Sequence, residues 1–297
     1  MSVGLQKYLV EIKKIVVSFP VVMSPVYMLI LSRIIIRIMA SSFEKFRDLH
    51  HQENLLLTGN VWNVSSALIY EQLGFKAIAL SSSAVAHSLG YEDGEGMPFE
   101  EYLFVIKRIM KSVSLPVSVD LEAGYGDTAE KVTANILRLT ELGVAGINIE
   151  DSLVRGAERK IQDAEIFTEK LKNITEALKN KGTDIYINVR SDAYILGLPD
   201  PLQESKRRIR LYETANVHGI FLPFILNEKE IAELTRFTGL PLHVMCMPGL
   251  PGFQTLQRLG VKRISMGGYA YRNTYEHLEK STKEIVEMQS FDSLFDH

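Results

Sequence analysis

From Phe43 onward, short apolar runs alternate with amphipathic helical runs, and this alternation limits the possible folds more than any other feature of the chain. Short, continuous apolar runs are typical of strands that are buried on both faces of a parallel sheet. The runs between them repeat apolar residues every three or four positions, as amphipathic helices do. The expected strands are Leu55–Gly59, Ala77–Ser81, Pro116–Asp120, Gly146–Glu150, Ile185–Arg190, Gly219–Pro223, Leu242–Cys246 and Arg263–Met266.

Eight strand–helix units in about 250 residues predict an α/β fold, a (β/α)8 TIM-type barrel. An open doubly wound sheet is the alternative. No low-complexity linker divides residues 43–297, so we expect them to form one catalytic domain. In such a barrel the functional residues lie at the carboxyl ends of the strands and in the loops that follow.

Charge and cysteine content exclude several classes of function. The chain has 33 Lys and Arg against 36 Asp and Glu, a formal net charge of −3, which gives no electrostatic reason to expect nucleic acid as a partner. The one cysteine, Cys246, excludes an internal disulfide and a multi-cysteine metal site. We expect Cys246 to be buried and structural, and the protein to be cytoplasmic.

Residues 1–42 form a hydrophobic, basic amino-terminal extension that differs from the rest of the chain. No charged residue lies between Ile15 and Ser32, and the apolar run continues to Met39. Residues 15–39 are nearly long enough to cross a membrane, although Pro20 and Pro25 interrupt them. Three interpretations remain: a membrane anchor, an extra helix packed on the domain or a partner, and an upstream extension before a functional start near Met39. The third is favoured.

Acidic residues follow two neighbouring strands. Asp120 and Glu122 end the third strand, where alternation places them on one face, and Glu150 and Asp151 end the fourth. Carboxylates crowded into one barrel mouth repel each other, and a divalent cation relieves that repulsion. All-oxygen ligands favour Mg²⁺, or Mn²⁺, over Zn²⁺. Helix capping is the alternative role for any one of these acids.

Other polar residues are expected at the same end of the barrel. Ser81, Ser82 and Ser83 follow the second strand and offer hydroxyl and N–H groups to an anionic ligand. Arg190 ends the fifth strand, where it can clamp a carboxylate or simply pair with a neighbouring acid. Trp62, at the end of the first strand, is a candidate pocket residue.

Taken in order, these segments resemble the isocitrate lyase / phosphoenolpyruvate mutase superfamily over roughly residues 43–280. The segments that carry the resemblance are Ser81–Ser83 with Ser88–Glu95, Asp120–Gly126, Gly146–Asp151, Asn188–Ala193 and Gly249–Gly268.

The resemblance implies a Mg²⁺-dependent enzyme that makes or breaks a C–C or P–C bond beside a 2-oxo or 2-hydroxy carboxylate, through a metal-bound enolate. It implies a metal shell of Asp93, Asp120, Glu122 and Glu150. It also implies substrate contacts from Ser81, Ser82, Ser83 and Arg190. Glu122 departs from the family, which commonly has Asp there, and Ser82 stands where members often have Gly. Besides Arg190 and Glu150, Tyr125 is a candidate catalytic residue as a proton donor; His87 is more plausible as a residue of a helix face.

The loop after the fourth strand, residues 151–163, limits the reaction. It lacks the Lys-Cys-Gly-His motif of the family's lyases, so we do not expect cleavage of isocitrate or methylisocitrate by the usual proton transfer. It also lacks the asparagine of the mutase branch, although Ser152, Arg155, Arg159 and Lys160 could bind an anion. We therefore expect a lyase or decarboxylase. A phosphonopyruvate/phosphoenolpyruvate mutase or hydrolase is one alternative, and a non-catalytic dicarboxylate-binding barrel is the other.

The carboxyl-terminal tail carries apolar residues that suggest a partner subunit. Phe291, Leu294 and Phe295 lie in the last eight residues. Some family members exchange their last helix between subunits, and we expect a homo-oligomer, a dimer or tetramer, here as well.

Overall fold

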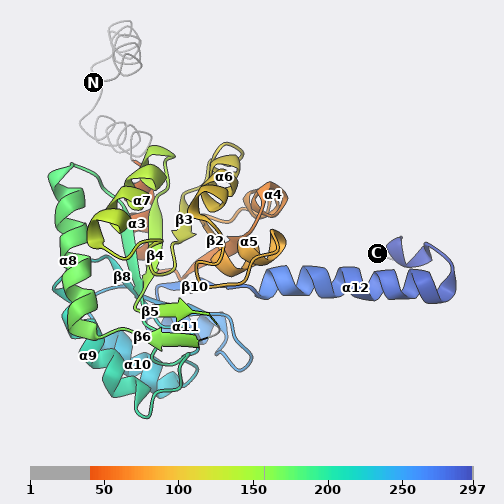
Figure 1. Cartoon of the computed structure of the whole chain (residues 1–297). Helices are drawn as coiled ribbons and strands as arrows, with labels where there is room; N and C mark the ends of the chain where they lie inside the picture. Colours follow the sequence, from red (N-terminus) through yellow and green to blue (C-terminus); the bar gives the residue numbers. More distant parts are fainter. Residues whose placement is uncertain (1–40, 157, 296–297) are drawn as a thin grey trace, which may run out of the picture. The chain divides into compact units, whose positions relative to one another are not determined.

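Eight parallel strands close into a barrel in the computed structural model, which describes residues 41–156 and 158–295 (Figure 1). Their order around the barrel is β1-β10-β9-β8-β7-β4-β3-β2. The predicted (β/α)8 architecture is confirmed, and each strand lies where the sequence placed it. The strands are β1 Leu56–Val61, β2 Ile78–Leu80, β3 Val117–Asp120, β4 Gly146–Glu150, β7 Tyr186–Arg190, β8 Gly219–Phe221, β9 Leu242–Met245 and β10 Arg263–Ser265.

Helices connect the strands on the outside of the barrel, and several begin at a side-chain cap. The Thr128 hydroxyl accepts a hydrogen bond from the Lys131 N–H, and the Asp163 carboxylate accepts one from the Ile166 N–H at 3.0 Å. The helices are α4 Val64–Gln72, α5 Ser82–Ser88, α6 Phe99–Met110, α7 Ala129–Glu141, α8 Ala164–Asn180, α9 Pro201–Glu213, α10 Glu228–Phe237 and α11 Phe253–Arg258.

Alternation along the strands divides their side chains between two environments. Apolar residues such as Ile147 and Val189 pack with the helices in the main buried core. Between them lie buried polar residues that bond to each other across strands. The Asn188 amide is 2.9 Å from the Asn148 side-chain oxygen and 3.0 Å from Nδ1 of His243. The bonds between these side chains compensate the cost of burying them.

A helix that the strand count did not include, α3 (Ser42–His50), packs against β7. A capping box between Ser41 and Glu44 starts the helix. Phe46 is fully buried and meets the Tyr186 ring edge-on at 5.3 Å between centroids. Residues 1–40 lie outside the described part of the chain, so the predictions for the extension, including a span over 15–39, stay predictions. Among the residues described, no helix is both long and apolar enough to cross a membrane.

Three further features differ from what the sequence indicated. The loop after β4 contains an antiparallel hairpin, β5 (Ser152–Arg155) and β6 (Glu158–Ile161), which forms a sheet of its own. The last helix, α12 (Tyr269–Met288), extends away from the barrel, and a short 3-10 turn, η1 (Asp292–Leu294), folds back on it (Figure 1). The prediction of a buried Cys246 was wrong, because β9 ends at Met245 and Cys246 is exposed in the loop that follows.

Candidate active site

The predicted acidic residues gather at the carboxyl ends of β3 and β4. Asp120 is the last residue of β3, and its Oδ2 accepts a 2.9 Å hydrogen bond from the Ser82 hydroxyl in the first turn of α5. Its other carboxylate oxygen, Oδ1, is buried without a hydrogen-bond partner among the described residues. Burial raises the pKa of Asp120, despite the opposing charge of Arg190.

Glu122 lies in the site because of a turn after β3, and not because of the predicted alternation along the strand. β3 has ended at Asp120, and Glu122 adopts a left-handed conformation with φ 51°. Its carboxylate accepts hydrogen bonds from the Glu95 N–H at 2.6 Å and from the Tyr125 hydroxyl at 3.0 Å. Burial, together with the charges of Asp93, Glu150 and Asp120, raises the pKa of Glu122 to about 9. Burial and the neighbouring acids therefore favour the protonated form of the Glu122 carboxyl group.

Glu150 and Arg190 form a buried ion pair at the ends of β4 and β7. Glu150 Oε2 is 2.8 Å from Nη1 of Arg190, whose Nε lies 2.6 Å from Asp192 Oδ1. Glu150 is 2% exposed and Asp192 is fully buried. Burial raises the pKa of Glu150, and the two flanking arginines oppose that shift. Arg190 thus pairs with the neighbouring acids Glu150 and Asp192. It also has N–H groups beyond those used in these contacts, which can bind a carboxylate.

Arg159, which the sequence marked only as a possible anion ligand, extends into the acidic cluster from β6. Its Nη1 forms an ion pair with Glu150 Oε1, and it also lies 3.0 Å from Asp192 Oδ2 and 2.9 Å from the Ser152 hydroxyl oxygen. Its Nη2 lies 3.5 Å from Asp93 Oδ2. Arg159 therefore contacts acids from three separate segments of the chain: the loop after α5, the end of β4 and the loop after β7.

Asp192 and Glu95 were missed as site residues, while Ser152, like Arg159, was marked only as a possible anion ligand. The first two lie inside segments that carry the family resemblance, so their position was a usable signal. Ser152 donates to Asp192 Oδ2 at 2.6 Å, a contact that depends on the hairpin.

Other predicted residues lie at the edge of this cluster. The Ser81 hydroxyl caps α5 by accepting from the Ala84 N–H at 3.3 Å, while Ser83 is partly buried in the first turn. Trp62 packs edge-on against Tyr271 of α12, with 5.4 Å between ring centroids. His87 is exposed on α5, which agrees with its interpretation as a residue of a helix face.

The chemistry of these donors fits a hard divalent cation. Several carboxylates share one buried region, and Asp120 Oδ1 lacks a partner there. Within residues 41–156 and 158–295, however, no group of three or more Asp, Glu, His or Cys side chains is placed so that it could hold a metal ion. The ligand types are those that Mg²⁺ prefers, but they do not converge in this conformation.

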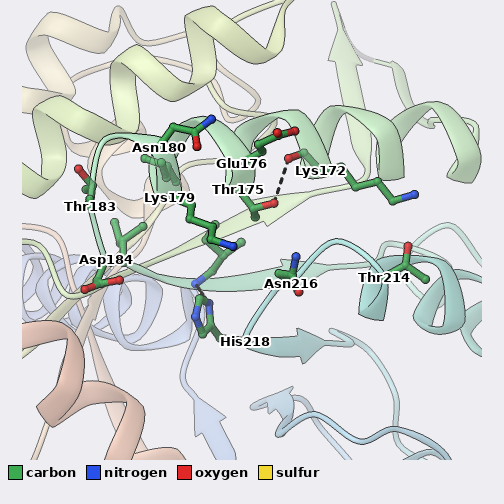
Figure 2. Close-up of a pocket in the computed structure, with 14 residues that line it drawn as sticks. Lys172, Thr175, Glu176, Lys179, Asn180, Thr183, Asp184, Thr214, Asn216 and His218 are labelled. Atoms are coloured by element: carbon green, nitrogen blue, oxygen red, sulfur yellow. Dashed lines mark hydrogen bonds between the residues drawn. The ribbon is translucent and has the colours of Figure 1, made fainter.

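Two cavities of very different volume lie at opposite ends of the barrel. A cavity of about 20 Å³ lies within the acidic cluster, lined by Gly94, Glu95, Glu122, Ala123, Glu150, Leu153 and Val154. A much larger cavity, about 660 Å³, lies near the amino ends of β7 and β8, where Lys172, Lys179, Asp184 and His218 line it (Figure 2). The cavity that borders the acidic cluster is therefore far smaller than the cavity near the amino ends of β7 and β8.

Comparison with known proteins gives consistent matches over the barrel. The family model of phosphoenolpyruvate phosphomutase matches residues 46–286. An uncharacterized protein of Mycobacterium tuberculosis is 33% identical over 226 residues, 76% of this chain and 83% of that protein. Oxaloacetate decarboxylase 1 of Pseudomonas fluorescens is 29% identical over 245 residues, 79% of this chain and 83% of that enzyme. The crystal structure of a candidate phosphonomutase from Burkholderia cenocepacia superposes with a TM-score of 0.75 at 33% identity, over 80% of this chain and 97% of that one.

Proposed function

Because the chain belongs to the isocitrate lyase / phosphoenolpyruvate mutase superfamily, we propose that it is a Mg²⁺-dependent carbon–carbon lyase or decarboxylase. Its substrate is a 2-oxo or 2-hydroxy carboxylate, and the bond beside the oxo or hydroxyl carbon is broken or formed through an enolate. The observation that carries the proposal is the gathering of Asp120, Glu122 and Glu150 around Arg190 at the carboxyl end of the barrel.

The carboxylates of Asp93, Asp120, Glu122 and Glu150 would hold the metal, Mg²⁺ or Mn²⁺. When bound, Mg²⁺ neutralises these acids and stabilises the negative charge that develops on the oxygens of an enolate. Binding would lower the pKa of Glu122, because a nearby positive charge favours the ionised carboxylate.

The polar residues around the acids position the substrate. Arg190 donates hydrogen bonds from Nε and Nη2 to Asp192 and lies 2.8 Å from Glu150 Oε2, and its other N–H groups are available to a substrate carboxylate. Ser81, Ser82 and Ser83 supply hydroxyl and N–H donors beside it. When the carbon–carbon bond breaks, its electron pair stays on the fragment that becomes the enolate. The other fragment leaves as carbon dioxide in a decarboxylation, or as a carbonyl compound whose hydroxyl proton passes to a base in a lyase reaction.

The cycle closes when a proton is added to the enolate carbon and the proton donor recovers its proton from water. The Tyr125 hydroxyl, hydrogen-bonded to Glu122, is the proton donor that we assign to this step. Burial and the neighbouring Glu122 raise the pKa of Tyr125, so the hydroxyl stays protonated until the enolate, a strong base, takes the proton.

A second candidate function is cleavage or rearrangement of a P–C bond, as in phosphonopyruvate/phosphoenolpyruvate mutases and hydrolases. The matching family model and the Burkholderia structure favour this alternative. The absence of the mutase asparagine from the loop after β4 argues against it.

The test uses the full-length chain with oxaloacetate, phosphonopyruvate, isocitrate, methylisocitrate and dimethylmalate, followed by proton and phosphorus NMR with Mg²⁺ or excess chelator. We expect Mg²⁺-dependent loss of a substrate with a carbon–carbon bond beside its oxo or hydroxyl group. Asp120→Asn should abolish it, while Asp127→Asn, an exposed control in the same loop, should not. Turnover of phosphonopyruvate alone would select the second candidate. Binding of oxalate without any turnover would overturn both in favour of a non-catalytic dicarboxylate-binding barrel.

A further inference from the structure

Both carboxylate oxygens of Glu150 are in contact with guanidinium groups. Oε1 is paired with Nη1 of Arg159, and Oε2 lies 2.8 Å from Nη1 of Arg190. Glu150 is 2% exposed, so it has little access to solvent from another side. Oε2 accepts no hydrogen bond among the described residues, so a metal ion that binds Glu150 would enter a space that two positively charged guanidinium groups already border.

Arg190 is the arginine that the barrel holds in place. It is the last residue of β7, and its Nε and Nη2 lie 2.6 and 3.2 Å from the two carboxylate oxygens of Asp192. The Asp192 N–H in turn donates to Asp151 Oδ1 at 3.0 Å. Asp151 is fully buried and also pairs with Arg208 of α9 at 3.1 Å. Moving Arg190 would disturb this whole set of contacts.

Arg159 belongs to a hairpin whose strands, β5 and β6, pair with each other and not with the barrel sheet. The guanidinium group bridges two of the proposed metal ligands, since Nη1 contacts Glu150 and Nη2 lies 3.5 Å from Asp93 Oδ2. Arg159 therefore contacts the same carboxylate oxygens that a cation would bind.

The space around these carboxylates supports the same conclusion. The cavity beside Glu122 and Glu150 measures about 20 Å³, little more than one water molecule needs. Leu153 and Val154 of β5 line it, and a Cβ atom added at Gly94 would lie 2.5 Å from Val154. This cavity is too small to hold a hydrated cation together with a substrate.

We propose that Arg159 is a resident counter-ion, and that a divalent cation displaces its guanidinium group from Asp93 and Glu150 when it binds. The inference rests on the proposed function, because it assumes that these carboxylates bind the metal. Two cations that share ligands bind in competition, and linkage makes the effect reciprocal. Arg159 weakens metal binding, and the metal exposes Arg159.

The first measurement is the affinity of the full-length protein for Mn²⁺, by isothermal titration calorimetry or electron paramagnetic resonance. Arg159→Gln should bind Mn²⁺ between about 5- and 150-fold more tightly than the unchanged protein, the usual range of coupling between two sites. Lys160→Gln is the matched control, because it removes the same charge from an exposed neighbour on β6. Its affinity should stay within about twofold.

The second measurement needs no variant. Phenylglyoxal modifies accessible arginine side chains, and mass spectrometry locates the product. Saturating Mn²⁺ should raise the rate of modification at Arg159 severalfold and leave the rate at Arg138, exposed on α7, unchanged. Protection of Arg159 by Mn²⁺, or an Arg159→Gln affinity that is unchanged or weaker, would overturn the proposal.

The design separates this inference from the proposed function. If the unchanged protein binds Mn²⁺, Asp120→Asn does not, and Arg159→Gln gains nothing, the displacement is wrong and the metal site remains. If neither the unchanged protein nor Arg159→Gln binds Mn²⁺, the displacement and the metal role in the proposed function both fail.

Discussion

Two residues of the loop after β3, Glu122 and Tyr125, have positive φ angles, 51° and 53°. For a residue other than glycine, this left-handed backbone conformation costs roughly 1–3 kcal/mol. It persists only where surrounding contacts hold the backbone in place. Here the Glu95 carboxylate accepts from the Tyr125 N–H at 2.6 Å, and the Glu95 N–H donates to Glu122. These two hydrogen bonds hold the turn in a conformation in which the Tyr125 hydroxyl donates to the Glu122 carboxylate.

Tyr125→Phe tests the proton donor. Loss of the hydroxyl should lower kcat by roughly 10²- to 10⁴-fold, the usual contribution of a positioned acid or base. KM should change little, because the ring and its contacts with Phe99 and Tyr102 remain. Steady-state kinetics on the substrate that NMR identifies gives both constants. Tyr91→Phe, which removes a hydroxyl bonded to exposed Glu101, is the control. An unchanged kcat in Tyr125→Phe would assign the proton to another group.

The elements that the sequence predicted are those with a strong apolar pattern. β4 begins and ends where expected, at Gly146 and Glu150, because its short run with Ile147 and Ile149 is typical of a buried strand. The β5–β6 hairpin has no such pattern, since it is short and polar, with Glu158 and Lys160 exposed. The role of Arg159 depends on that hairpin, and so it could not be derived from spacing along the chain.

The same reasoning explains the errors in the site. Asp120 and Glu150 end regular strands, and their places followed from the barrel. Glu122 reached its place through a turn that alternation does not describe. Cys246 was expected to be buried because a strand was extended by one residue, and at the end of a strand one residue separates the core from solvent.

Helix α3 makes the barrel sensitive to acid. His50 on its inner face is 1% exposed, stacks on Tyr186 at 4.2 Å and donates from Nδ1 to the Phe46 carbonyl oxygen at 2.7 Å. Burial, with the charge of Arg263, lowers the pKa of His50 from 6.5 to about 3. Between these values the unfolded chain binds a proton that the folded chain does not, so stability falls as the pH falls.

The size of this effect is about 1.4 kcal/mol per pH unit below pH 6.5 for one such histidine. His50→Gln keeps a donor for the Phe46 carbonyl and should reduce the pH dependence by that amount. Urea unfolding at pH 7, 6 and 5 measures it, and His51→Gln, on an exposed neighbour, should keep the original dependence. If the free energy of unfolding changed equally with pH in the unchanged protein, His50→Gln and His51→Gln, His50 would be protonated in the folded protein as it is in the unfolded chain.

At the scale of the whole molecule, the end of the chain exposes apolar side chains that the barrel does not cover. Leu278 is 56% and Val286 64% exposed on α12, and they line one groove with Tyr275. Phe291 and Phe295 near η1 are also exposed. Clustered apolar exposure of this kind is typical of protein interfaces. We therefore keep the prediction of a homo-oligomer and assign the contact to α12.

Leu278→Glu combined with Val286→Glu should shift the protein toward monomer, because charges would enter an apolar contact. Size-exclusion chromatography with light scattering gives the mass. Phe104→Glu places a charge on an equally exposed residue of α6 and should leave the mass unchanged. A monomeric unchanged protein, or an oligomer that survives the double substitution, would contradict this assignment.

Because the barrel is closed, β1 pairs with the last strand, β10, and this pair can form only late in synthesis. The Thr58 hydroxyl on β1 donates to the Ile264 carbonyl oxygen on β10, 206 residues further along the chain. At ribosomal speeds of about 5–20 residues per second, β1 waits roughly 10–40 s for that neighbour to be synthesised. Until then one edge of β1 has no partner strand. In the last part of this interval, every acidic residue of the site has been translated, but that edge is still open. We expect the nascent chain to need protection during this interval, since an open strand edge invites pairing with other chains.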